Sequence, residues 1–191
     1  MIKKRLVLAS SSPRRIALLK SLGFHFDIVP HTIEEYIPGD ILPGELVMQL
    51  AYVKAEDVAK KEKNAIIIAA DTVVLHGKDI LGKPKDIRDA KRILSLLSNS
   101  DHDVVSGVCV MDTPSKWKVL RISRTHIKMK FISEEEIDAY IKSGEPMDKA
   151  GAYAIQGEGR KFVEHINGSL SNVVGLPVEL VQEMLNDFTK N

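Results

Sequence analysis

Residues 65–75 read Ala-Ile-Ile-Ile-Ala-Ala-Asp-Thr-Val-Val-Leu, an apolar run broken only by Asp71 and Thr72. A short run that is apolar at consecutive positions and rich in β-branched residues is typical of a central strand covered on both faces. An unpaired buried carboxylate is costly, so Asp71 must be paired, protonated or placed at the edge of a cleft. Asp71 is therefore a candidate site residue. The alternative is a structural aspartate that is hydrogen-bonded to a neighbouring loop.

Apolar patterns on both sides of this run predict a mixed α/β fold. By their hydrophobic periodicity, further strands are expected at residues 5–9, 24–29, 102–111, 117–131 and 161–166. Helices are expected after residue 12 as far as Gly23, and at residues 43–63, 86–97, 133–142 and 177–188. The helix at 133–142 has the clearest start, a capping box of Ser133 and Glu136. Since no repeat or linker is visible, we expect one compact domain over residues 1–191.

Length and charge limit the classes of function. A chain of 191 residues, 44% of them apolar, can bury one substantial core. Lys and Arg total 27 against 26 Asp and Glu, so no long-range field collects nucleic acid or anionic membrane. Aromatic residues, at 5%, are also too few for a typical nucleic-acid-binding module. Any phosphate binding must therefore be local.

Cysteine usage and hydropathy predict a soluble, cytoplasmic protein. The single cysteine, Cys109, lies in an apolar run and cannot form an internal disulfide, which indicates a reducing compartment. The basic start of the chain is not followed by the apolar region of a signal peptide. No apolar run reaches the ~18 residues that a membrane span needs. The six histidines show no metal-ligand spacing, and no phosphate-binding P-loop or dinucleotide fingerprint occurs.

The segment Ser10-Ser11-Ser12-Pro13-Arg14-Arg15 is the first candidate phosphate site. Ser12 suits the N-cap of the following helix and Pro13 its first position, so free backbone N–H groups and the positive end of the helix dipole face the loop. Arg14 and Arg15 in the first turn are unfavourable there unless an anion arrives. A phosphate would supply that anion. The alternative is an ordinary serine-capped helix with two solvated arginines.

Lys54 is the second unusual cation. It falls on the apolar stripe of the helix predicted at 43–63, with Val47, Leu50, Ala51 and Val58 at helical spacing. The side chain can run along its methylene stem to the surface, or it can reach into a pocket that holds phosphate.

Weaker candidates lie in loops. Glu34 and Glu35 follow a predicted strand, where a carboxylate can be a hard oxygen ligand for Mg²⁺ or Mn²⁺, although a solvated acidic turn is the commoner explanation. Lys83, before Pro84, is a rigidly presented cation. Gln156 ends the small-residue stretch 148–157 and offers a donor and an acceptor to a base edge. The alternative for Gln156 is an exposed amide in a glycine-bounded turn.

Taken in order, these segments resemble the Maf family of nucleoside triphosphate pyrophosphatases over residues 6 to about 188. The matching pieces are Ala9-Ser10-Ser11-Ser12-Pro13-Arg14-Arg15, Ile33-Glu34-Glu35, Lys54-Ala55, Ala70-Asp71-Thr72-Val73-Val74, Gly82-Lys83-Pro84, Asp148 to Gly157 and Val174-Gly175-Leu176-Pro177. Each piece alone is weak, but the ordered set is specific.

The resemblance implies a fold related to the inosine triphosphate pyrophosphatases: a twisted mixed sheet flanked by helices, with two lobes around a cleft, and often a homodimer. It implies hydrolysis at the α-phosphorus of a nucleoside triphosphate with the help of Mg²⁺ or Mn²⁺. By this resemblance Asp71 is the general base and Glu35 helps to hold the metal. Ser10, Ser12, Arg15, Lys54 and Lys83 bind the triphosphate. Arg14, Thr72 and Gln156 match the branch that prefers dTTP and UTP.

The sequence leaves two rival functions. The first is a nucleotide-sensing regulator of cell division that binds triphosphate without turnover, since the family is also linked to restraint of division. Asp71 argues against it, because binding an anion gains nothing from a nearby carboxylate unless a metal or water intervenes. The second is a nucleic-acid-binding module, which the charge and the aromatic content disfavour.

Overall fold

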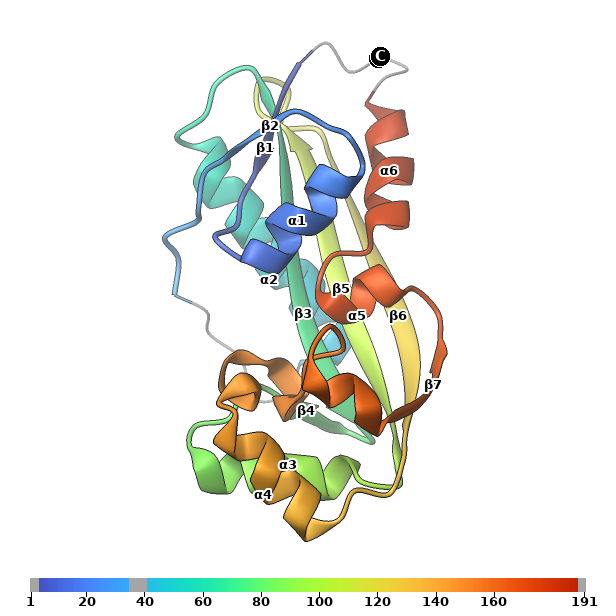
Figure 1. Cartoon of the computed structure of the whole chain (residues 1–191). Helices are drawn as coiled ribbons and strands as arrows, with labels where there is room; N and C mark the ends of the chain where they lie inside the picture. Colours follow the sequence, from blue (N-terminus) through green and yellow to red (C-terminus); the bar gives the residue numbers. More distant parts are fainter. Residues whose placement is uncertain (1–3, 35–40, 189–191) are drawn as a thin grey trace. The chain divides into compact units, whose positions relative to one another are not determined.

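The computed structural model describes residues 4–34 and 41–188, which divide into two compact units. The first unit comprises Met1–Thr72, Ser106–Ser123 and Gly175–Asn191, and the second comprises Val73–Val105 and Arg124–Val174. Figure 1 shows the course of the chain.

The helices and strands follow the predicted order closely. The strands are β1 (Arg5–Leu8), β2 (Phe26–Ile28), β3 (Ala65–His76), β4 (Asp79–Leu81), β5 (Asp101–Asp112), β6 (Lys118–Met129) and β7 (Val163–Asn167). The α-helices are α1 (Pro13–Ser21), α2 (Pro43–Ala59), α3 (Ile87–Leu97), α4 (Glu134–Lys142), α5 (Leu170–Val174) and α6 (Val178–Asp187). Three short 3₁₀ helices are η1 (Glu145–Asp148), η2 (Ala150–Ala152) and η3 (Glu158–Phe162).

Within the described residues, seven strands form one mixed sheet in the order β2-β1-β3-β5-β6-β7, with β4 paired to β3. Strand β1 runs parallel to β2 and β3, whereas β4 is antiparallel to β3 and β7 is antiparallel to β6. Leu8 pairs with Ile68, and the N–H of Ala9 donates to the Ile68 carbonyl at 2.8 Å. The chain therefore leaves β1 beside the part of β3 that leads to Asp71.

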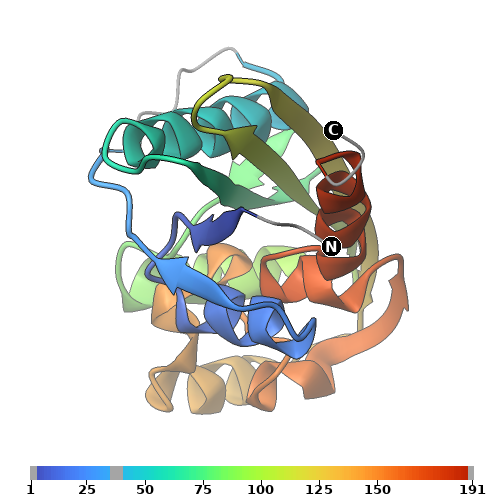
Figure 2. The ribbon, with the colours of Figure 1, turned by 90° about the horizontal axis from the view of Figure 1, so that it is seen from above.

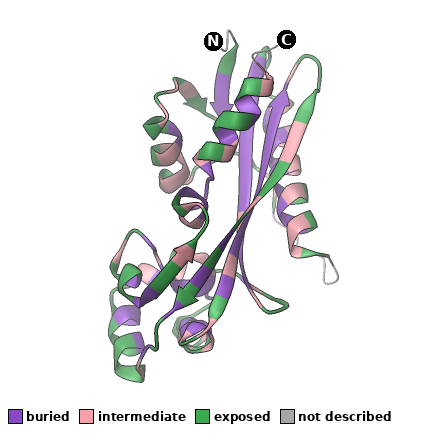
Figure 3. Ribbon diagram, turned by 90° about the vertical axis from the view of Figure 1, so that its right-hand side faces the viewer, coloured by how far each residue is buried: buried purple, intermediate pink, exposed green. Residues whose placement is uncertain are grey.

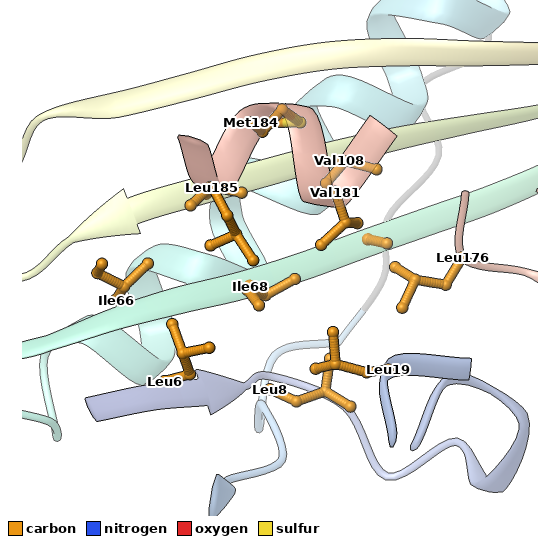
Figure 4. Packing of buried hydrophobic residues seen from close by; sticks show 12 residues of the cluster. Leu6, Leu8, Leu19, Ile66, Ile68, Val108, Leu176, Val181, Met184 and Leu185 are labelled. Carbon is orange, nitrogen blue, oxygen red and sulfur yellow. The ribbon is translucent and has the colours of Figure 1, made fainter. Parts of the chain in front are cut away.

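The core of the first unit lies on both faces of β1 and β3, as the predicted central strand requires. Alternate residues of β3 face opposite layers. One layer contains α1 and α6, and its buried cluster comprises Leu6, Leu8, Leu19, Ile66, Ile68, Ala70, Val108, Val110, Leu176, Val181, Met184 and Leu185 (Figure 4). The other layer contains α2, and its cluster comprises Val7, Ala9, Ala51, Ala55, Val58, Ala65, Ile67, Ala69, Cys109 and Met111. Figure 2 shows α1 and α2 on the two sides of β1 and β3.

Helix α2 packs very close to the sheet. A Cβ atom added to Gly107 of β5 would collide with the backbone carbonyl of Val47, so only glycine permits this approach. Cys109 is buried two residues further along β5, and burial raises the pKa of its thiol to about 12. The prediction of a buried, unpaired cysteine is confirmed.

The second unit places α3 against α4, with η1 and η2 beside them. The capping box predicted at Ser133 and Glu136 is present: the Ser133 hydroxyl accepts from the Glu136 N–H, and the Glu136 carboxylate accepts from the Ser133 N–H. Tyr140 is fully buried near the end of α4 and meets Phe162 edge to face, with 5.2 Å between ring centroids. The buried ring of Tyr140 therefore packs the end of α4 against η3.

The mixed α/β prediction is confirmed, with differences at element ends and in short elements. Strand β3 is buried along most of its length (Figure 3), as its sequence predicts, whereas α2 ends at Ala59 rather than at Lys63. The prediction omitted β4, α5 and the 3₁₀ helices, which have three to five residues and leave too short a periodic pattern. Among the described residues, no helix has the length and apolar character to span a membrane.

Candidate functional site

The candidate site of the first unit centres on a buried ion pair between α2 and β3. The Lys54 ammonium donates to the Asp71 carboxylate, with 2.6 Å between Nζ and Oδ1. The side chains are only 2% and 10% exposed. Removing either partner would leave a charge in a place where water cannot solvate it.

The sequence around each partner explains why they meet. Asp71 follows Ala69 by two residues, so its side chain faces the same layer, which is the layer of α2. Lys54 lies beside Ala51 and Ala55, which pack in that layer and leave room for a long side chain. Asp71 is therefore paired, one of the three states that its sequence context allowed. The alternative in which Lys54 reaches solvent along its stem is wrong, because its ammonium is buried on Asp71.

The loop between β1 and α1 has the predicted helix start. Ser12 is the N-cap, its hydroxyl accepts from the Arg15 N–H at 3.5 Å, and Pro13 occupies the first turn. The hydroxyl of Ser10 accepts from the Ser12 N–H at 3.2 Å, and Ser10 is buried, with 4% exposure. The first turn of α1 contains no acidic residue, so its positive end is not offset by side chains within that turn.

Arg15 is held in one orientation by the backbone and side chains of the first unit. Its Nε donates to the Gly175 carbonyl at 2.9 Å, and an Nη donates to the Thr72 hydroxyl at 3.4 Å. Thr72 also donates to the Gly175 carbonyl at 3.3 Å and lies 2.8 Å from the Ser106 hydroxyl. A hydroxyl has one proton, so while Thr72 donates to Gly175 it accepts from Ser106. The arginine predicted to bind phosphate is thus oriented by Gly175 and Thr72, and Ser106 in turn contacts Thr72. Arg14, in the same turn, is half-buried.

Gly175 has a conformation that fits this contact. Its φ of 124° lies in a region that residues other than glycine rarely adopt. In this conformation the carbonyl of the glycine, which lies in the segment Val174-Gly175-Leu176-Pro177, accepts hydrogen bonds from both Arg15 and Thr72. Ser106, fully buried, was missed because a serine in a predicted buried strand reads as an ordinary core residue.

The ion pair and the arginine cluster lie on opposite faces of β3. Asp71 pairs with Lys54 in the layer of α2, and the next residue, Thr72, contacts Arg15 of α1 in the other layer. Consecutive residues of one strand therefore place a carboxylate against Lys54 and a hydroxyl against Arg15, in two different layers.

In the second unit, a backbone hydrogen bond joins the loop that carries Lys83 to the segment that leads to Gln156. Lys83 is exposed after β4, and the carbonyl of its neighbour Gly82 accepts from the Gly151 N–H at 3.1 Å. Gly151 has a φ of 73°, and an added Cβ atom would lie 2.9 Å from a methyl group of Val74. The turn at 150–152 therefore requires glycine. Gln156, five residues later, is exposed.

Tyr153 anchors the same segment from inside. Its hydroxyl lies 2.8 Å from Nε2 of His102, and the two rings meet edge to face with their centroids 5.5 Å apart. Both side chains are buried, at 5% and 2% exposure, and Nδ1 of His102 is a buried atom without a hydrogen-bond partner. Burial chiefly lowers the pKa of His102 to about 4. The histidine is therefore neutral at physiological pH.

Comparison with known proteins gives the family. The model of the family described as "Maf-like protein" matches residues 5–188. This chain belongs to the Maf family. A protein of Dictyoglomus thermophilum named "dTTP/UTP pyrophosphatase" is 48% identical over 186 residues, which cover 97% of this chain and 96% of that protein. A protein of Alkaliphilus metalliredigens with the same name is 48% identical, over 96% and 95% of the two chains.

A solved structure from Vibrio cholerae is far more distant from this Maf-family chain. It is 10% identical with a TM-score of 0.40 over 74% of this chain and 78% of that chain, too loose a match to bear on the fold.

The resemblance assigned the metal of this Maf-family chain to Glu35, which lies outside the described residues. Glu34 is described and exposed. Among residues 4–34 and 41–188, no three His, Cys, Asp or Glu side chains gather as a metal site would require. Mg²⁺ in phosphoryl-transfer sites commonly needs only one or two carboxylates, with substrate phosphates and waters as the other ligands. A single carboxylate, such as the one that the resemblance assigns at Glu35, is enough for that smaller role.

We expect His102 to make this Maf-family chain sensitive to acid. The unfolded chain binds a proton at the imidazole near pH 6.5, while burial holds the folded pKa at about 4. This contribution to stability is complete above pH 6.5 and is lost as the pH falls toward 4, by about 3 kcal/mol. Urea unfolding of the wild type and of His102→Phe across this range measures it. We expect the difference between the two curves to slope with pH, and two parallel curves would contradict the assignment.

Proposed function

We propose that this chain hydrolyses dTTP and UTP to the nucleoside monophosphate and pyrophosphate. The proposal is supported by the relatives named "dTTP/UTP pyrophosphatase", each matched over nearly its whole length. The single structural observation that carries it is the buried pair of Lys54 and Asp71 on β3, whose next residue, Thr72, contacts Arg15 on the other face of the strand. A carboxylate beside a cation can accept a proton from water that attacks a phosphate, whereas a protein that only binds the anion gains nothing from it.

The proposed reaction needs one base and one leaving group. Asp71 accepts a proton from water, whose oxygen forms a bond to the α-phosphorus. The bond from that phosphorus to the bridging oxygen breaks, and pyrophosphate leaves with the bonding electron pair. Such transfer depends on positioning and on charge stabilisation more than on a covalent nucleophile.

The triphosphate is proposed to bind to the cations and to the helix start. Ser10 and Ser12 present the loop before α1, and Arg15 supplies a guanidinium held at a fixed angle by Gly175 and Thr72. The other proposed substrate-binding residues are Arg14, Lys54, Lys83 and, for the base, Gln156. We propose that residues 1–191 act as one catalytic domain, and the homodimer and the cytoplasmic location stay predictions.

A divalent cation, Mg²⁺ or Mn²⁺, is proposed to accompany the substrate. When bound, it would neutralise phosphate charge and polarise the bond to the leaving group. Glu35 is the carboxylate proposed to hold it. The proton transfer and the orientation of the phosphates are assigned to the side chains of the chain itself.

The test is a nucleotide panel with identification of both products. Purified protein is incubated with dTTP, UTP, dCTP, CTP, dATP and dGTP in the presence of Mg²⁺ or Mn²⁺. We expect monophosphate and pyrophosphate in equal amounts, fastest from dTTP and UTP. Release of orthophosphate would place the attack at the γ-phosphorus and overturn the proposal. Tight binding without turnover would instead support the nucleotide-sensing regulator.

A further inference from the structure

A buried tyrosine and a glutamate form hydrogen bonds with the backbone of the segment that carries Gln156. The Tyr140 hydroxyl, at the end of α4, donates to Oε1 of Glu145 at 2.7 Å and accepts from the Ala154 N–H at 3.0 Å. One phenol thus joins the start of η1 to the backbone two residues before Gln156. All of these residues belong to the second unit.

The Glu145 carboxylate accepts hydrogen bonds from the backbone on the other side of Gln156. Its Oε2 accepts from the Glu158 N–H at 3.2 Å, and its Oε1 accepts from the Gly159 N–H, also at 3.2 Å. Together with the tyrosine, three donors converge on one carboxylate. An ionised carboxylate only accepts hydrogen bonds, so it can serve all three.

Two glycines show how tightly the segment sits on this pair. A Cβ atom on Gly157 would collide with the Glu145 carboxylate, and one on Gly159 would lie 2.7 Å from the Tyr140 hydroxyl. A side chain at either position would push the backbone away from the Tyr140 hydroxyl and the Glu145 carboxylate, which accept its hydrogen bonds. The segment therefore rests directly on Tyr140 and Glu145.

The electrostatics agree with this arrangement. Desolvation alone would raise the pKa of Glu145, but the hydrogen bonds from Tyr140, Gly159 and Glu158 outweigh it and hold the pKa below its usual value. The carboxyl group is thus ionised at neutral pH, in the state that accepts all three bonds. An amide at this position would have one accepting oxygen and would bring an unwanted donor.

Gln156 itself is exposed, midway between the two anchored points. The backbone is held at Ala154 by Tyr140 and at Glu158 by Glu145, two residues away on each side. An amide that discriminates between bases must be held in place, because a loose one adapts to any base edge.

We propose that Glu145, oriented by Tyr140, is a positioning residue that sets the base selectivity of the nucleotide site by fixing the backbone around Gln156. The inference rests on the proposed function, in which Gln156 contacts the base. It assigns no direct contact with substrate to Glu145.

The test compares Glu145→Gln with the matched control Glu158→Gln. Both make the same chemical change in the same region, but Glu158 is exposed and contributes its backbone N–H, which the control retains. For each variant, kcat and KM are measured with dTTP and dCTP. Kd values for both nucleotides and for inorganic triphosphate are measured by calorimetry with Ca²⁺ in place of Mg²⁺.

We expect Glu145→Gln to lower the preference for dTTP over dCTP by about tenfold, the size of effect expected from the loss of one or two hydrogen bonds. The loss should lie in KM and Kd rather than in kcat. The Kd of inorganic triphosphate, which has no base, should be unchanged and shows that the variant is folded. Tyr140→Phe should act in the same direction, and Glu158→Gln should match the wild type.

A further combination tests the route of the effect. In the Gln156→Ala background, Glu145→Gln should cause no additional loss of preference, because the residue through which it acts is gone. An unchanged preference in Glu145→Gln, or additive losses in the double variant, would overturn the inference. The ratio of the Kd values for dTTP and dCTP, measured by calorimetry, decides this and does not depend on catalysis. Failure of the wild type to release pyrophosphate would count against the proposed function, whereas an unaltered Kd ratio counts against Glu145.

Discussion

Asp71→Asn is expected to lower kcat for dTTP by about 10²- to 10⁴-fold, the usual contribution of a general base. The amide retains the shape of the carboxylate but cannot take a proton from water. The affinity for nucleotide should change little, because the cations that bind the phosphates remain. Steady-state kinetics with pyrophosphate detection gives kcat, and calorimetry with dTTP gives Kd.

The ion pair complicates this experiment in a way that can be controlled. Asparagine removes the charge that faces the buried Lys54 ammonium, so the variant must be assayed well below its unfolding temperature. Thr72→Val leaves Asp71 and Lys54 intact, so it measures separately the loss caused by removing the contact with Arg15. If Asp71→Asn, folded by circular dichroism, keeps more than a tenth of wild-type kcat, then Asp71 is not the base.

Lys54→Met is expected to destabilise the protein by about 3–5 kcal/mol, because it leaves the Asp71 carboxylate buried without its partner. Methionine has nearly the shape of the lysine stem, so the packing in the layer of α2 is largely preserved. The free energy of unfolding, from urea titration at neutral pH, measures the effect.

The double variant Lys54→Met with Asp71→Leu serves as the control. Replacing both charges of a buried pair by apolar groups is often neutral or stabilising, so most of the lost stability should return. Activity should not return, since the proposed base is absent. A loss below about 1 kcal/mol in Lys54→Met, which is the range of solvent-exposed pairs, would show that Lys54 and Asp71 are not desolvated in solution.

The sequence predicts most of the fold because the long elements have a clear period. Strand β3, the cap at Ser12 and the capping box at Ser133 each follow from a few adjacent residues. The apolar neighbours of Asp71 predict that it is paired, protonated or at the edge of a cleft, but they do not identify its partner. Lys54 is 17 residues away, and only the packing of α2 on the sheet brings the two together.

The network around Arg15 could not be predicted for the same reason. Arg15, Thr72, Ser106 and Gly175 come from four separate segments of the chain, and a serine and a threonine in strands carry no local signal of their role. The same holds for Tyr140, which reads as a helix residue at an apolar position. Its hydroxyl gains a function only when Glu145 and Ala154 fold against it.

The alternation of β3 also restricts how this protein can change. Deleting or inserting one residue between positions 65 and 70 would turn every later side chain of the strand to the other layer. The carboxylate would then face α1 and the hydroxyl would face Lys54, so both partnerships would be broken at once. A change of length in this strand would therefore cost both contacts together, whereas a replaced side chain leaves the alternation intact.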